Sequence, residues 1–159
     1  MKGRIGLGLV LLALLAPAAG ALNRDFGLGI VVGEPTGITG KAWLSRRNAF
    51  DFAAAWSVAD ESALHLHGDF LMHRFDLFRV DPGRLPLYYG IGGRIRVFDD
   101  KRFLGDDRVQ LGLRIPVGLD YLFEEAPFDV FLEVVPILDL LPATDFDLNA
   151  SLGGRYWFH

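Results

Sequence analysis

The chain ends in the segment Phe146-Asp147-Leu148-Asn149-Ala150-Ser151-Leu152-Gly153-Gly154-Arg155-Tyr156-Trp157-Phe158, where apolar residues alternate with mostly polar or small ones. Successive side chains of a β-strand point to opposite sides, so this alternation predicts a strand with one apolar and one polar face. A helical period of 3.6 does not fit, because it would spread the apolar side chains around the axis. The fold is therefore predicted by following the period of two upstream.

Seven further segments show this period, and they lie at 26–33, 38–45, 50–58, 63–73, 86–98, 108–122 and 128–139. Turn-like residues separate them, and short links join neighbouring strands as antiparallel hairpins. An up-and-down sheet of eight strands normally closes, since closure removes its edges. The predicted fold is thus all-β, an eight-stranded antiparallel up-and-down barrel. Pro116 and Pro136 each remove a ladder hydrogen bond and are expected to bend their strands locally.

Composition sets the class of protein. The chain has 159 residues, 51% of them hydrophobic and 23% charged, which suits one folded domain and excludes a disordered chain. Its net charge of −4 argues against a nucleic-acid partner. It contains no cysteine, so stability must come from burial and backbone pairing rather than from disulfides.

The first residues have the order of a secretory signal peptide. Lys2 and Arg4 precede the uncharged apolar run 5–15, and a small-x-small site ends at Ala21. The alternative is a membrane-spanning helix, but the run is short and no basic cluster closes it. We therefore predict a signal peptide at 1–21 and one barrel domain at 22–159. After residue 21 no apolar stretch reaches the ~18–20 residues of a membrane helix, so entry into a membrane would have to use strands.

The two faces of the strands differ in charge and in size. No position on the apolar face is charged, as lipid requires, because a basic residue at the middle of a bilayer costs about 2–4 kcal/mol. The charged face carries many small residues, which suit the cramped interior of a small barrel. We therefore expect the charged face inside and the apolar face in lipid. Aromatic residues near strand ends fit an interfacial girdle: Phe50, Tyr121, Phe123, Phe128, Tyr156 and Phe158. The alternative is a soluble periplasmic lipocalin-like barrel with an apolar ligand cavity.

The charges expected inside the barrel are nearly balanced. The cations are Lys41, Arg94, Arg96, Arg108, Arg114 and Arg155, and the anions are Asp51, Asp69, Asp120, Asp129, Glu133, Asp139 and Asp147. Unpaired buried charges are costly, so the sequence predicts a lumen plugged by salt bridges in which the strand histidines also take part. A conducting pore would need a wider barrel, such as the ~16–18 strands of porins.

Two chemical sites are weaker candidates. His65, His67 and Asp69 alternate along one strand and could ligate a metal ion in the lumen, although hydrogen bonds to neighbouring carboxylates explain them as well. A lipid-modifying hydrolase could combine Ser57 or Ser62 with one of these histidines and with Asp69 or Glu133. Those strand residues face the lumen, which disfavours a lipid substrate. We therefore expect no catalysis and no cofactor.

The last residues resemble the C-terminal insertion signal of bacterial outer-membrane barrels. The matching positions are Ser151, Gly153, Tyr156 and Phe158, although the family ends on the aromatic residue and here His159 follows. The mature chain also resembles short outer-membrane barrels of unknown function, in Gly33-Glu34-Pro35-Thr36-Gly37, in residues 85–94 and in Thr144-Asp145-Phe146-Asp147. Such proteins are similar in architecture to the OmpA transmembrane domain.

This resemblance implies a place in the bacterial outer membrane, insertion by the barrel-assembly machinery and contact with outer-membrane lipid, and it transfers no catalytic residue. We expect a monomer with a structural or adhesive role in the envelope. The predicted loops are short, which makes large-surface recognition less favoured.

Overall fold

The computed structural model describes residues 26–34, 36–57, 63–98, 109–141 and 143–158, and the predicted signal peptide at 1–21 lies outside this part. The strands are β1 (Phe26–Gly33), β2 (Thr36–Trp43), β3 (Asn48–Ser57), β4 (Ala63–Arg74), β5 (Leu87–Phe98), β6 (Val109–Arg114), β7 (Val117–Leu122), β8 (Phe128–Leu141) and β9 (Asp145–Phe158). No helix in the described ranges is long and apolar enough to cross a membrane.

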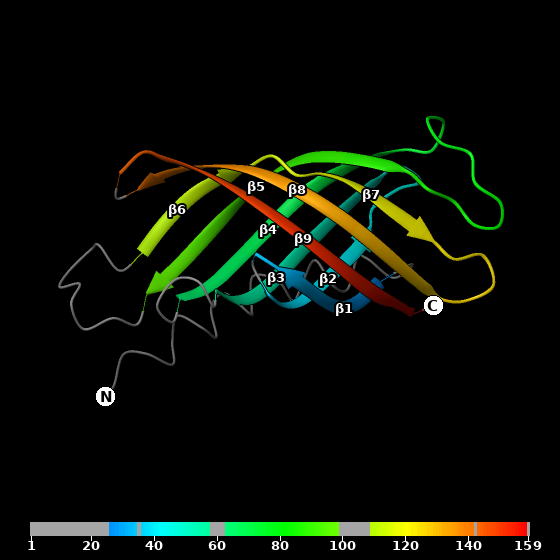
Figure 1. The fold of residues 1–159 in the computed structure, drawn as a ribbon, viewed down its shortest axis with the longest axis horizontal. Helices are drawn as coiled ribbons and strands as arrows, with labels where there is room; N and C mark the ends of the chain where they lie inside the picture. The colour runs from blue at the N-terminus through cyan, green and yellow to red at the C-terminus, as the bar shows by residue number, and fades with distance from the viewer. Residues whose placement is uncertain (1–25, 35, 58–62, 99–108, 142, 159) are drawn as a thin grey trace.

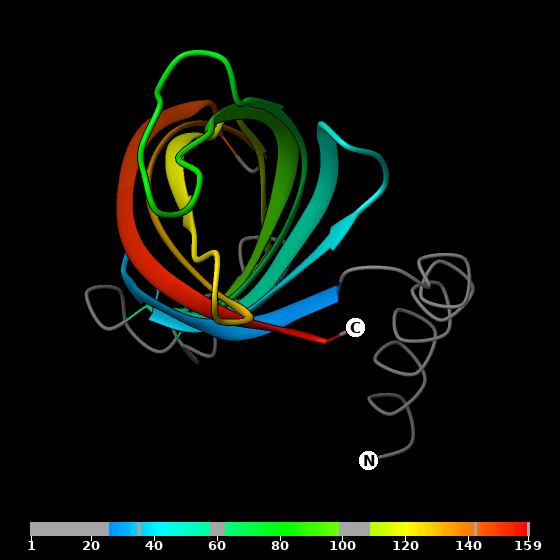
Figure 2. The same ribbon diagram turned by 90° about the vertical axis from the view of Figure 1, so that its right-hand side faces the viewer.

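The strands form one closed antiparallel ring (Figures 1 and 2). Each strand from β1 to β5 pairs with the next along the chain. The first and last strands then pair with each other over eight residue positions, from Phe26 opposite Phe158 to Gly33 opposite Ser151. This last pairing removes the sheet edges, so the predicted barrel is confirmed.

The predicted strand 108–122 is two strands, which raises the count within the described ranges to nine. The chain leaves the ladder at Ile115 and Pro116, between β6 and β7. Proline cannot donate a backbone hydrogen bond, and this position confirms the expected irregularity. The barrel stays closed because the carbonyl of Pro116 accepts from Gly90 N at 3.0 Å and Ile115 N donates to the carbonyl of Pro136 at 3.0 Å. Both short strands pair with β5 and β8, so together they occupy one position in the ring.

Pro136 has a smaller effect than expected. It lies within β8, which runs unbroken from Phe128 to Leu141 and keeps its register with β9, Pro136 facing Leu148.

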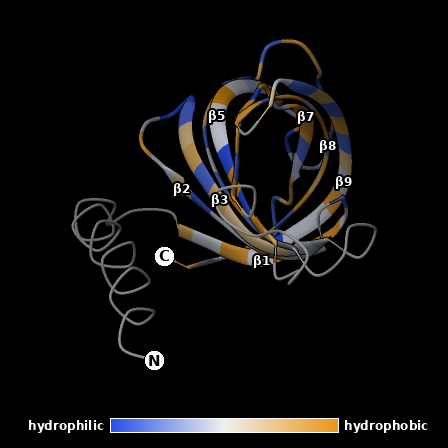
Figure 3. Cartoon of the chain, turned by 90° about the vertical axis from the view of Figure 1, so that its left-hand side faces the viewer, coloured by the Kyte–Doolittle hydropathy of each residue, from blue (hydrophilic) through white to orange (hydrophobic). Residues whose placement is uncertain are grey.

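The barrel has the charged face inside and the apolar face outside. Large hydrophobic side chains such as Ile30 (63% exposed) and Leu152 (54% exposed) cover the outer surface, whereas Lys41, Asp120 and Arg114 are buried. A soluble barrel would have the opposite arrangement, so the lipocalin-like alternative is wrong. Figure 3 shows the alternation of hydrophilic and hydrophobic residues along the strands.

The small residues on the inner face make room for larger neighbours, as predicted. Phe131 on β8 faces Gly153 on β9 in register, and the Phe131 ring lies over that glycine. A Cβ atom at position 153 would come within 2.4 Å of the ring carbon Cζ of Phe131. The narrow lumen is thus filled by its own side chains.

We call the end where β1 begins and β9 ends the terminus end; it also carries the turns 44–47, 75–86 and 123–127. Aromatic side chains gather there as expected of a girdle: Tyr121 and Phe123 have centroids 4.8 Å apart, and Tyr156 lies 5.2 Å from Phe128 and 5.0 Å from Phe158. Figure 2 looks onto this end of the barrel.

Candidate functional sites: the charged lumen and the cavity at its terminus end

Three groups of ion pairs follow one another along the lumen. The group nearest the terminus end is centred on Asp120 of β7. Its Oδ2 accepts a hydrogen bond from Lys41 Nζ of β2 at 2.7 Å and another from Arg155 of β9 at 3.4 Å. Arg155 also donates to Asp129 of β8 at 3.0 Å. Lys41 Nζ donates to His73 Nε2 at 2.8 Å as well. Because β2 and β7 are not neighbours in the ring, the Lys41–Asp120 pair bridges the lumen.

The middle group is centred on Arg114 of β6. Its guanidinium contacts Asp69 of β4 at 3.0 Å and Glu133 of β8 at 3.4 Å, and all three side chains are buried. The Tyr88 hydroxyl donates to Glu133 at 2.7 Å. Charge-assisted hydrogen bonds of this kind are stronger than neutral ones, so the middle of the lumen is held by several of them.

The third group lies toward the opposite end. Arg94 of β5 donates to both carboxylate oxygens of Asp139 and, at 3.2 Å, to Asp147 of β9. Asp147 is half-exposed, unlike the other two. Arg96 is buried beyond this group and donates to Gln110 at 3.4 Å.

Most of the predicted lumen residues therefore meet in ion pairs. Arg108 lies outside the described residues. Asp51 is buried, forms no salt bridge within the described ranges, and its Oδ1 has no hydrogen-bond partner there. His65 Nε2 and His67 Nδ1 are likewise buried without a partner among those residues, and the two rings meet edge to face at 5.5 Å. The expectation that each histidine pairs with a carboxylate is thus wrong for these two atoms.

The residues that could ligate a metal ion differ from the predicted set. The structure brings together Asp51, His67 and Asp69, with possible ligand atoms within 4.8 Å of one another, and His65 is not part of this group. The register explains the exchange, because Asp51 on β3 lies directly opposite Asp69 on β4. Asp69 is already engaged by Arg114, whose positive charge would oppose a cation at the same place.

The described residues contain no catalytic arrangement for the hydrolase candidate. Ser62 lies outside the described residues, and Ser57 ends β3 opposite Ala63 in the register. His65 and His67 lie on the next strand with buried ring nitrogens facing the lumen. Nucleophilic catalysis needs a hydroxyl within hydrogen-bond reach of its base, and the described contacts contain no such pair.

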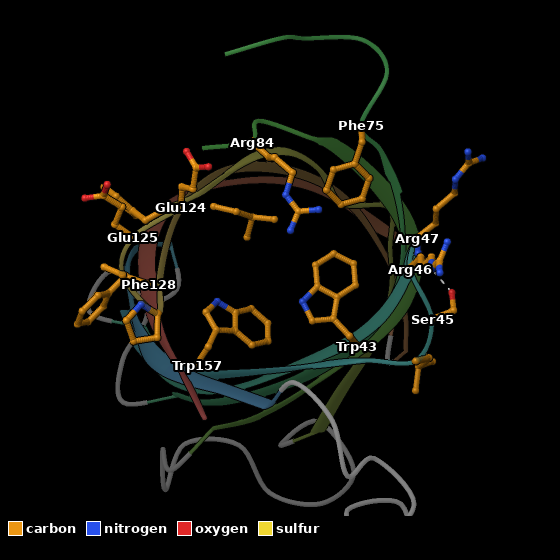
Figure 4. Close-up of a pocket in the computed structure, with 15 residues that line it drawn as sticks. Trp43, Ser45, Arg46, Arg47, Phe75, Arg84, Glu124, Glu125, Phe128 and Trp157 are labelled. Atoms are coloured by element: carbon orange, nitrogen blue, oxygen red, sulfur yellow. Dashed lines mark hydrogen bonds between the residues drawn. The ribbon is translucent and has the colours of Figure 1, made fainter. Parts of the chain in front are cut away.

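A cavity of about 1030 Å³ opens at the terminus end (Figure 4). Trp43 of β2, Trp157 of β9, Phe75 and Arg84 point into the opening, whereas Arg46, Arg47, Glu124 and Glu125 point away from its centre. The alternation of the strands does not predict this cavity. A signal was present, since Trp43 and Trp157 occupy inward positions of their strands, where the pattern otherwise places polar or small residues.

Comparison with solved structures identifies the fold. The N-terminal β-barrel domain of Pseudomonas aeruginosa OprF is similar with a TM-score of 0.62 and 16% identity, over 84% of this chain and 97% of that one. The chain has the fold of an outer-membrane β-barrel. Yersinia pestis outer membrane protein Ail is aligned over the same shares, with a TM-score of 0.47 and 17% identity. No protein-family model matches the chain, and no curated protein matches it in sequence.

This outer-membrane barrel fold agrees with the predicted resemblance to the OmpA transmembrane domain. An uncharged outer band around a charged interior is the arrangement of barrels that span the bacterial outer membrane. The chain accordingly has the fold and the apolar outer surface that the sequence predicts for an outer-membrane barrel.

The residues of the predicted insertion signal lie along β9. Tyr156 and Phe158 are exposed on the outer face near the end of the strand, whereas Ser151 and Gly153 lie on the inner face. Recognition by the barrel-assembly machinery remains a prediction, and His159 is outside the described residues.

Proposed function

We propose that this protein is a monomeric structural component of the outer membrane, with its apolar face in contact with lipid and its lumen closed to ions by the charged network. The observation that carries the proposal is the set of ion pairs between strands that are not neighbours. Lys41 of β2 reaches Asp120 of β7, and Arg114 of β6 reaches Asp69 of β4. These contacts cross the space that a conducting path would need.

Conductance in a planar lipid bilayer tests the closed lumen. We expect the full chain, refolded into lipid, to give no ion-conducting steps of constant size at neutral pH. Folding and insertion of the same sample are checked by its altered migration on an SDS gel without boiling. Reproducible steps from folded protein would contradict the closed lumen.

Complementation separates a structural role from catalysis or metal binding. Cells that lack the protein are expected to become more sensitive to detergent, and the full chain should restore resistance. The double variant His65→Ala/His67→Ala should restore it equally, because these ring nitrogens support no ion pair in the described network. A folded double variant that fails to complement would favour the metal or hydrolase alternative.

The adhesive alternative has weaker support. An adhesin needs a recognition surface on its loops, and the sequence predicts only short loops between its strands. We therefore place the structural role first.

A further inference from the structure

We propose that the cavity at the terminus end binds a small organic anion with a planar apolar body, such as an aromatic carboxylate. This inference goes beyond the proposed structural role and does not depend on it. Its basis is the combination of an aromatic wall, a buried indole N–H that lacks an acceptor among the described residues, and an exposed guanidinium that forms no ion pair with them.

Three aromatic rings form the wall. The ring centroid of Trp43 lies 6.2 Å from that of Trp157, with an interplanar angle of 32°. It also lies 6.2 Å from the centroid of Phe75, with an interplanar angle of 35°. The three rings come from β2, from β9 and from the loop 75–86, so they surround the opening from different sides (Figure 4). Rings at such distances pack against one another, and the ring faces that stay uncovered can stack with a planar apolar group.

Trp157 supplies the first donor. The residue is only 6% exposed, and its indole Nε1 has no hydrogen-bond acceptor among the described residues. Buried indole N–H groups usually have a partner, because leaving one unsatisfied is unfavourable. The Trp157 side chain points into the cavity in Figure 4, so an acceptor atom of a bound molecule could satisfy this N–H.

Arg84 supplies the second donor and the positive charge. Its guanidinium lies 5.3 Å from the centroid of the Phe75 ring and forms no ion pair with any described residue. The backbone of Arg84 is fixed by hydrogen bonds with Leu122 in both directions, at 3.1 and 2.8 Å. These bonds fix the main chain only, and the exposed guanidinium extends from it toward the opening in Figure 4. There it could bind a carboxylate through two parallel hydrogen bonds.

The described carboxylates around the cavity do not form an ion pair with Arg84. Beneath the wall, Lys41 and Arg155 are balanced by Asp120 and Asp129. Glu124 and Glu125 line the cavity, but their side chains point away from its centre. The inner part of the cavity therefore offers donors and one positive charge, which selects an anion. A volume of about 1030 Å³ is ample for a small organic molecule.

Tryptophan fluorescence can report on this cavity selectively. The chain has three tryptophans, and Trp56 is 56% exposed on the outer face. In the variant Trp56→Phe the two remaining tryptophans both line the cavity. We suggest titrating this variant of the full chain, folded in zwitterionic lipid nanodiscs, with 4-nitrobenzoate as a quenching probe and with neutral 4-nitrobenzamide as its control.

We expect saturable quenching by 4-nitrobenzoate and at least tenfold weaker binding of the amide. Adding Arg84→Gln should weaken binding of the carboxylate at least tenfold. The matched control Arg79→Gln changes the same loop outside the cavity lining and should leave binding unchanged. Adding Trp157→Phe keeps a ring and removes the N–H, so binding should weaken several-fold, with Trp43 as the reporter. Migration on an SDS gel without boiling verifies that each variant is folded.

Three results would overturn the proposal. They are quenching that rises linearly without saturation, equal affinity for the amide, and an Arg84→Gln variant that is folded and binds like Arg79→Gln.

Discussion

At the scale of single residues, Asp120 joins two buried cations of the lumen. It accepts hydrogen bonds from both Lys41 and Arg155, and all three side chains are buried. Breaking a buried ion pair by removing one partner is strongly unfavourable, because the other charge stays buried without compensation. The stability of the barrel should therefore depend on this one carboxylate.

We predict that Asp120→Ala lowers the free energy of unfolding by about 3–5 kcal/mol, measured by urea titration of protein refolded into lipid vesicles. The control is Asp76→Ala, which removes an exposed ion pair with Arg74. In that pair the hydrogen bond from Arg74 lowers the pKa of Asp76 to about 2. Solvent screens that pair, so its loss should change stability little. Equal effects of the two substitutions would contradict a central role for Asp120.

The next prediction adds a charge to the outer face instead of removing one from the lumen. Leu152 lies near the middle of β9 and points outward. Leu152→Arg should lower the free energy of unfolding in vesicles by about 2–4 kcal/mol, because the cation would sit in hydrocarbon. Leu152→Ala is the matched control and should have a clearly smaller effect. If arginine were tolerated like alanine, this part of β9 would not face lipid.

At the scale of elements, adjacent glycines on β9 contrast the two faces of one strand. A side chain at Gly153 would meet the Phe131 ring inside the barrel, whereas one at Gly154 would have its nearest atom, the carbonyl oxygen of Asp129, at 3.2 Å. The inner face is thus filled, and the outer face is less crowded although not open.

We predict that Gly153→Ala costs about 1–3 kcal/mol of folding free energy through overpacking, and that Gly154→Ala costs less. The measurement is the same vesicle unfolding titration. The result is informative because the two substitutions are identical and differ only in the face they change. A larger loss from Gly154→Ala would show that the inner face is not packed as described.

The division between β6 and β7 shows how one residue acts on an element. The alternation from 108 to 122 predicts a single strand, and the ladder breaks where Ile115 and Pro116 leave it. Pro136 likewise has no backbone N–H to donate within a sheet, yet β8 remains continuous. The two prolines have different effects because their positions in the pairing differ, which the local sequence does not reveal.

At the scale of the whole molecule, closure joins the two ends of the described chain. β1 and β9 pair over eight positions, so unfolding must open a ring rather than peel an edge strand. We predict that the protein in membranes of expressing cells resists SDS without heating and migrates differently after boiling. It should stay in the outer-membrane fraction. Release into the soluble fraction without this shift would contradict a membrane barrel.

The sequence by itself determined the strands apart from the division of 108–122, together with their order and the direction of their faces. This was possible because the period of two is local and because lipid excludes charge from one face along every strand. The residues of the lumen network follow from the same alternation, and most of them meet in ion pairs.

The tertiary structure alone decided which of those residues meet and where the lumen is open. Asp51, and not His65, joins His67 and Asp69 in the possible metal-ligand group, because the register of β3 against β4 places Asp51 opposite Asp69. Trp43, Phe75, Arg84 and Trp157 converge because closure brings β2, β9 and the loop 75–86 to one end. Alternation assigns a side chain to a face, but register and closure, which depend on residues far apart in the chain, decide its neighbours.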